Sequence, residues 1–173
     1  MSSTTDKDAL VVSQIAYMNI ENGDIEEAVD RYGSATLENI FEVTDGKIEQ
    51  DYIERVYGNK DPKTTKLSEY EQMRLEEAKA FIEEIKNSEY AQWEIVEIKD
   101  DNANSGFYGC MIDCGDGRSM FGFRGSESDS IHQKRQDWFN ADFALFNNIL
   151  TEQQKVAQDF VKDMNKKYGD KYT

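Results

Sequence analysis

The sequence is poor in the residues that cross-link a chain or bind metal ions. Its 173 residues include one proline, one histidine (His132) and two cysteines. Cys110 and Cys114 fall on one predicted strand, about 13 Å apart at about 3.3 Å per residue. A disulfide needs Cα atoms within about 7 Å, and there is no C-x-x-C pair to indicate a zinc site. The sequence therefore predicts two free thiols, no metal and no cofactor.

Basic residues and long apolar runs are also scarce. Lysine and arginine total 20 against 35 aspartates and glutamates, a net charge of −15. Such a chain repels nucleic-acid phosphates and anionic lipids, which argues against a nucleic-acid partner. No apolar run approaches transmembrane length, and the first residues lack the basic start and apolar core of a signal peptide. We expect a cytoplasmic protein, or one exported without a signal peptide of the usual kind.

The first half has the apolar spacing of helices. An Asn-Gly-Asp sequence at 22–24 is expected to stop the first of them. Ser68 followed by Glu71 is a capping box, which predicts a helix running to about Lys86. The many carboxylates of this half are explained by solvated helix faces. We assign 1–90 to a helical N-terminal part. Its shorter helices are expected over 6–20, 25–32, 36–43 and 48–57.

The second half has the pattern of strands. A strand is predicted over 93–98, and a hairpin follows with strands over 108–113 and 119–123. Gly115 and Gly117 tolerate positive φ, so a hairpin turn explains the aspartates beside them better than a calcium loop does. After a polar loop, Thr151 is expected to cap a helix over 152–168. The expected fold class is α/β, with helices followed by β-β-β-loop-α.

The end of the hairpin carries a motif. Phe123-Arg-Gly-Ser126, a loop and Asp137-Trp-x-x-x-Asp142 resemble the F-R-G-[ST]…D-W-x-x-D signature of the lipase class 3 family and related lipase-like bacterial hydrolases. The helix after them resembles the family helix that precedes the nucleophile strand. The resemblance covers 93–173 and implies a partial α/β-hydrolase fold. In that fold 91–173 forms the first strands and first helix of the core, and the nucleophile strand and everything after it are lacking.

The resemblance implies a role for the residues around this motif. Ser126, through its backbone N–H and its Oγ, corresponds to an oxyanion-hole residue that donates to a developing negative charge. Arg124 and Gly125 shape the loop before it, and Arg124 is suited to pairing with the carboxylate of Asp142. On the residues alone, Ser126 could also simply cap a turn after a strand.

Two further residues of the motif receive roles from the resemblance. Asp137 is expected to accept hydrogen bonds that fix the Ser126 loop, and Trp138 is expected to pack in the core or line the acyl site. Asp137 and Asp142 could instead stabilise a helix N-terminus with no further role. His132 is expected to be an exposed loop residue, because nothing in the sequence orients it as a base for Ser128 or Cys114.

The sequence departs from the family where catalysis would begin. It contains no G-x-S-x-G, and His132 precedes the position where the nucleophile would lie, whereas the family histidine follows it. We therefore expect an N-terminal half of a lipase- or esterase-like serine hydrolase, inactive alone, with an ester or lipid substrate only in the full-length protein. A missing C-terminal half or a partner chain would supply the rest. The alternative is a non-catalytic acidic protein-interaction module on a degenerate lipase-like scaffold.

Overall fold

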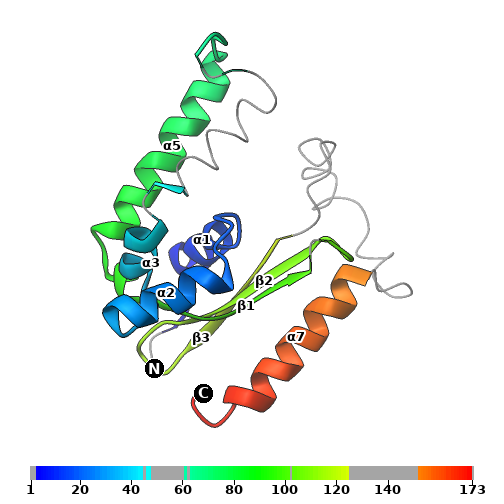
Figure 1. Cartoon of the computed structure of the whole chain (residues 1–173). Helices are drawn as coiled ribbons and strands as arrows, with labels where there is room; N and C mark the ends of the chain where they lie inside the picture. Colours follow the sequence, from blue (N-terminus) through cyan, green and yellow to red (C-terminus); the bar gives the residue numbers. More distant parts are fainter. Residues whose placement is uncertain are drawn as a thin grey trace.

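The fold is described from a computed structural model of the chain, which covers residues 3–44, 46–47, 61, 63–101, 103–124 and 152–172 (Figure 1). Its helices and strands lie in three layers. The N-terminal helices cover one face of a small sheet and the C-terminal helix covers the other. Of the helices described, none has the length and apolar character needed to cross a bilayer.

The N-terminal layer contains α1 (Asp6–Ile15), α2 (Asn22–Tyr32), α3 (Leu37–Thr44), α5 (Glu69–Lys86) and the short 3₁₀ helix η1 (Glu89–Gln92). The capping box at the start of α5 is confirmed. Ser68 N–H donates to Glu71 Oε2 at 2.8 Å, and Glu71 N–H donates to Ser68 Oγ at 3.2 Å. The helix predicted over 48–57 lies outside the described residues.

Two predicted boundaries in this layer are wrong. The first helix ends at Ile15 rather than Ile20, and 22–24 begins α2 instead of stopping α1. The reason is local: the Asp24 carboxylate accepts the N–H of Glu21 at 2.8 Å and so caps a new helix. Between the helices the chain turns sharply, with Asn19 at a positive φ of 52°.

The sheet has three antiparallel strands in the order β1 (Glu94–Asp101), β2 (Phe107–Asp113) and β3 (Ser119–Arg124). This confirms the three predicted strands and the mixed α/β class. The β2–β3 turn places Gly115 and Gly117 at φ 77° and 85°, as expected of a hairpin. The neighbouring Asp116 pairs with Arg118 at 2.8 Å. Among the described residues, no cluster of His, Cys, Asp or Glu could hold a metal ion.

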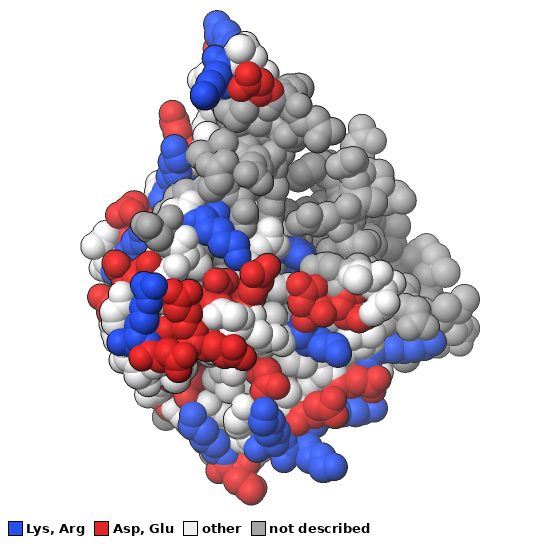
Figure 2. Space-filling model, viewed as in Figure 1, with Lys and Arg blue, Asp and Glu red and all other residues white. Residues whose placement is uncertain are grey.

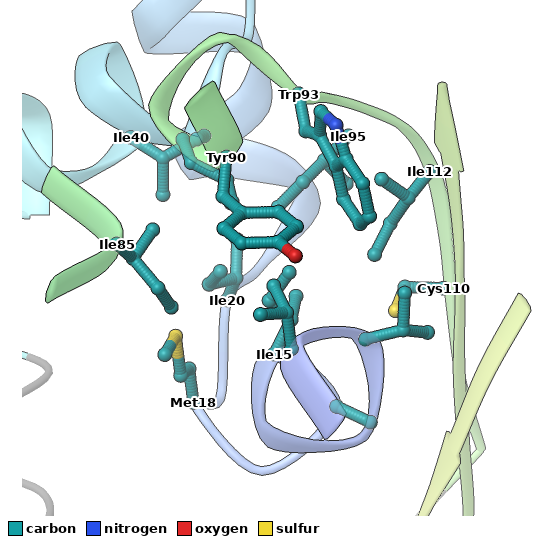
Figure 3. Close-up of a cluster of buried hydrophobic side chains, with 14 of the residues drawn as sticks. Ile15, Met18, Ile20, Ile40, Ile85, Tyr90, Trp93, Ile95, Cys110 and Ile112 are labelled. Atoms are coloured by element: carbon teal, nitrogen blue, oxygen red, sulfur yellow. The ribbon is translucent and has the colours of Figure 1, made fainter. Parts of the chain in front are cut away.

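The larger apolar core lies between the helices and the sheet (Figure 3). Residues of α1, α3, α5 and η1 meet residues of β1 and β2 there, so the helical part and the strands share one core. Cys110 and Cys114 are both buried and both free thiols, as expected. The labelled members of this core in Figure 3 are Ile15, Met18, Ile20, Ile40, Ile85, Tyr90, Trp93, Ile95, Cys110 and Ile112.

The opposite face of the sheet carries a smaller core beneath α7 (Glu152–Tyr168), a helix that the sequence predicted with the same bounds. Its buried members are Phe107 and Met111 of β2 with Phe160 and Met164 of α7. Polar contacts fix the end of the helix, because Glu97 accepts from Lys167 at 2.9 Å and from Tyr168 at 3.0 Å. Asp113 likewise accepts from Lys171 at 3.2 Å and from Tyr172 at 2.9 Å.

Close approach of α1 to β3 generates a first prediction. A Cβ on Gly122 would lie 2.9 Å from the carbonyl oxygen of Val12 and 3.1 Å from Cys110 Sγ. Gly122→Ala should therefore destabilise the fold by about 1–3 kcal/mol, because helix and strand must move apart. Gly23→Ala is the control, since nothing lies within 4 Å of its Cβ position, and it should stabilise by about 0.4–1 kcal/mol. Urea unfolding measures both, and equal stability of the two variants would contradict the packing described.

Candidate functional site

Arg124, the last residue of β3, directly precedes Gly125 and Ser126 in the chain. It is one of the few buried charged residues described, with 5% of its surface exposed. Its guanidinium lies over the ring of Tyr108, 4.7 Å from the centroid, and its Nη1 donates to Oδ1 of Asn19. An aromatic face and a neutral acceptor therefore hold this charge inside the fold.

The alternation of side chains along β3 explains why Arg124 points inward. Tyr108 is its direct partner across β2 and belongs to the core under the helices. Phe123, one residue earlier, faces the other side, where its ring lies 5.9 Å from that of Phe107 in the core under α7. Successive residues of a strand point to opposite faces, so Arg124 must point toward the helices.

Of the residues that the sequence analysis proposed as a site, only Arg124 is described. Gly125, Ser126, Asp137, Trp138 and Asp142 lie outside the described residues, and so does His132. The pairing of Arg124 with Asp142 therefore stays a prediction. The described contact of Arg124 with Asn19 was not predicted, because no sequence pattern joins residues 105 positions apart. Its contact with Tyr108, across the predicted hairpin, was not predicted either.

A second buried polar group lies at the opposite end of β3. Asp8 accepts from Thr5 N–H at 2.9 Å, from Tyr90 Oη at 3.0 Å and from Arg118 Nη1 at 3.5 Å. The Thr5 backbone hydrogen bond, together with those from Tyr90 and Arg118, holds the pKa of Asp8 below 3.8 despite its burial. These contacts tie α1 to η1 and to the β2–β3 hairpin, so Asp8 acts as a structural link.

The cysteines are poorly suited to nucleophilic chemistry. Burial raises the pKa of Cys110 to about 12 and that of Cys114 to about 11. A thiol with such a pKa is protonated at neutral pH, and the thiolate is the reactive form. Neither cysteine has the properties of a catalytic nucleophile.

A groove of about 380 Å³ lies between β1 and α7. It opens on the face of the sheet that α7 covers, since Asp101 pairs with Phe107, whose ring contacts Phe160 of α7. Arg124 points to the other face, so the groove is separate from it. Its lining has four carboxylates, one lysine and four apolar side chains: Glu97, Asp101, Asp159 and Asp163, then Lys99, then Ile98, Val156, Phe160 and Met164.

Comparisons of this chain with protein-family models, with curated proteins and with solved structures find no match.

The burial of Asp8 predicts a pH-dependent loss of stability. Because its pKa is lower in the folded state, its contribution is present above the ordinary value of 3.8 and is lost as the pH falls through the folded pKa. Asp8→Asn should destabilise by about 1–3 kcal/mol at pH 7, with a smaller difference from the wild type at pH 3. Asp6→Asn, an exposed change in the same helical turn, is the control. Urea unfolding at the two pH values measures this, and a pH-independent difference would contradict it.

The contacts of Arg124 predict a second stability effect. Arg124→Met keeps an unbranched stem but leaves Asn19 Oδ1 without this donor and removes the cation from Tyr108. We expect the free energy of unfolding to fall by about 2–4 kcal/mol. Arg31→Met is the matched control, because Arg31 pairs with Glu27 on the exposed surface of α2, and it should change stability by less than about 0.5 kcal/mol. Chemical unfolding of both variants is the measurement. Similar decreases in the free energy of unfolding would show that the buried contacts of Arg124 contribute little to stability.

Proposed function

We propose that this chain supplies the oxyanion-hole loop of a lipase- or esterase-like serine hydrolase with a partial α/β-hydrolase fold. The observation that carries the proposal is the anchoring of Arg124 at the end of β3, directly before Gly125-Ser126. A loop that must present a backbone N–H to a reacting carbonyl needs a rigid point of departure. The buried guanidinium supplies one.

The arrangement of β3 and α7 also supports this proposal. β3 is the last strand in the order β1-β2-β3, and α7 packs on the face opposite the N-terminal helices. A strand followed by a helix that packs across one face of the sheet is the start of a β-α-β unit. A further strand would then pair in parallel with the outer edge of β3. Ser126 would follow the carboxyl end of β3, where open α/β sheets bind ligands.

The proposed chemistry is acyl transfer from a carboxylic ester. As a nucleophile attacks the ester carbonyl, negative charge develops on its oxygen, and Ser126 N–H and Oγ donate to it. One such donor is worth about 3 kcal/mol of the barrier. Asp137 accepts hydrogen bonds that fix the loop, Trp138 lines the acyl site, and Asp142 pairs with Arg124.

The nucleophile and its base belong to polypeptide outside these 173 residues, because the sequence has no G-x-S-x-G and its one histidine precedes the required position. The chain alone should neither hydrolyse esters nor react with a fluorophosphonate probe. Its substrate, an ester or lipid, is bound only by the complete enzyme.

Substitution of Ser126 in the protein encoded by the complete reading frame tests the proposal. Ser126→Ala removes the hydroxyl donor and should lower kcat for p-nitrophenyl esters about 100-fold with little change in KM. Ser126→Thr keeps a hydroxyl and should retain most of the activity. Unchanged kcat in Ser126→Ala would refute the oxyanion role. Absence of both hydrolysis and fluorophosphonate labelling would refute the hydrolase and leave the non-catalytic acidic module.

A further inference from the structure

The connection between α1 and α2, residues 16–21, is hydrogen-bonded to the ends of β2 and β3. Asn19 Oδ1 accepts from Arg124 of β3, and the carbonyl of Ile20 accepts from Tyr108 Oη of β2 at 2.6 Å. Next to the connection, Asn22 of α2 donates from Nδ2 to the carbonyl of Ile98 in β1 at 3.3 Å. One short stretch of the N-terminal part thus contacts all three strands.

These contacts converge on one end of the sheet. Tyr108 is the partner of Arg124 in β3 and also of Asp100 in β1, next to Asp101 at the end of that strand. Arg124 is the last residue of β3 and Tyr108 the second residue of β2. The connection therefore holds the end of the sheet from which the chain continues into Gly125.

The backbone conformation of the connection directs the side chain of Asn19 toward Arg124. It is the one non-glycine residue with positive φ in the described part of the chain, at 52°. Its neighbours Met18 and Ile20 are each 1% exposed and belong to the main core. The left-handed conformation turns the Asn19 side chain toward Arg124 while both neighbours stay buried. Asparagine tolerates this conformation better than other residues with a Cβ.

We propose that Asn19 is a positioning residue for the oxyanion-hole loop and acts through Arg124. This inference rests on the proposed function. An oxyanion donor is effective only within a few tenths of an ångström of its required position. A shift of about 1 Å in a supporting element can cost about 100-fold in rate. The helical N-terminal part, for which the family resemblance implies no role, thereby holds Arg124, the last residue of β3.

Three substitutions of Asn19 separate its side chain from its backbone conformation. Asn19→Gly keeps the left-handed backbone accessible and removes the acceptor. Asn19→Asp keeps an acceptor, and Asn19→Ala removes the acceptor and disfavours the backbone. In the protein encoded by the complete reading frame, Asn19→Gly should lower kcat about 10- to 100-fold with KM within about twofold of the wild type. Asn19→Asp should retain kcat within about threefold of the wild type.

A second readout on the present chain does not depend on activity. NMR follows hydrogen exchange of the Arg124 side-chain Nη–H groups, one of which donates to Asn19, and of the β3 amides. Exchange at Arg124 should be at least about 10-fold faster in Asn19→Gly than in the wild type or Asn19→Asp, because the accepting oxygen is lost.

The two readouts distinguish the possible failures. Hydrolysis with wild-type kcat in Asn19→Gly overturns the positioning role and leaves the oxyanion role intact. If all three variants, Asn19→Asp included, lose activity only in proportion to the loss of folded protein, the positioning role is overturned and Asn19 has a structural role alone. If no hydrolysis occurs at all, the proposed function fails, and unchanged exchange at Arg124 in Asn19→Gly then shows that Asn19 does not hold Arg124 either.

Discussion

The buried guanidinium of Arg124 is the constraint on which the rest of this structure depends. A charge inside a protein is costly unless its donors and its aromatic neighbours replace the lost water. Here Tyr108 of β2 and Asn19 of the α1–α2 connection both contact the guanidinium, so its burial links β3 to both elements. An apolar residue would fill the same space at lower cost. An arginine at this position is explained if the position of the strand end matters more than the stability that an apolar residue would add.

The two faces of the sheet differ in the size of the apolar core that covers them. The helical layer shares a large core with β1 and β2, whereas the described core under α7 has four buried residues, two from β2 and two from α7 itself. Contacts of Glu97 and Asp113 add to it. Aspartate and glutamate outnumber lysine and arginine in the sequence, by 35 to 20, and many of these carboxylates lie on the surface. On the face shown in Figure 2 they form patches with lysines and arginines between them. The helical layer therefore contributes more of the fold's stability, and α7 adds the second covered face.

Local signals in the sequence predicted most of the regular structure. The three strands, the glycine turn of the hairpin, the Ser68 capping box and α7 each depend on residues close together in the chain. The boundary between α1 and α2 was predicted wrongly, because Asn22-Gly-Asp24 reads as a helix breaker unless Asp24 is known to cap Glu21. The spacing of Cys110 and Cys114 also predicted the free thiols correctly.

The contacts that join residues far apart in the chain could not be predicted in this way. Asn19 meets Arg124 across 105 positions, and Tyr90 meets Asp8 across 82. Tertiary packing creates such pairs, and neither the spacing of apolar residues nor a sequence motif predicts them. The motif around Ser126 suggested a function, and of its residues proposed as a site the structure describes Arg124 and its contacts.

The central claim is that the end of β3 delivers the Ser126 amide to a developing oxyanion. A crystal structure of the protein encoded by the complete reading frame, with a phosphonate ester bound to its nucleophilic serine, tests this most directly. The account predicts the phosphonyl oxygen about 2.7–3.1 Å from Ser126 N and Oγ, with Arg124 against Tyr108 and Asn19. A Ser126 amide bonded within the fold, away from the phosphonate, would contradict it.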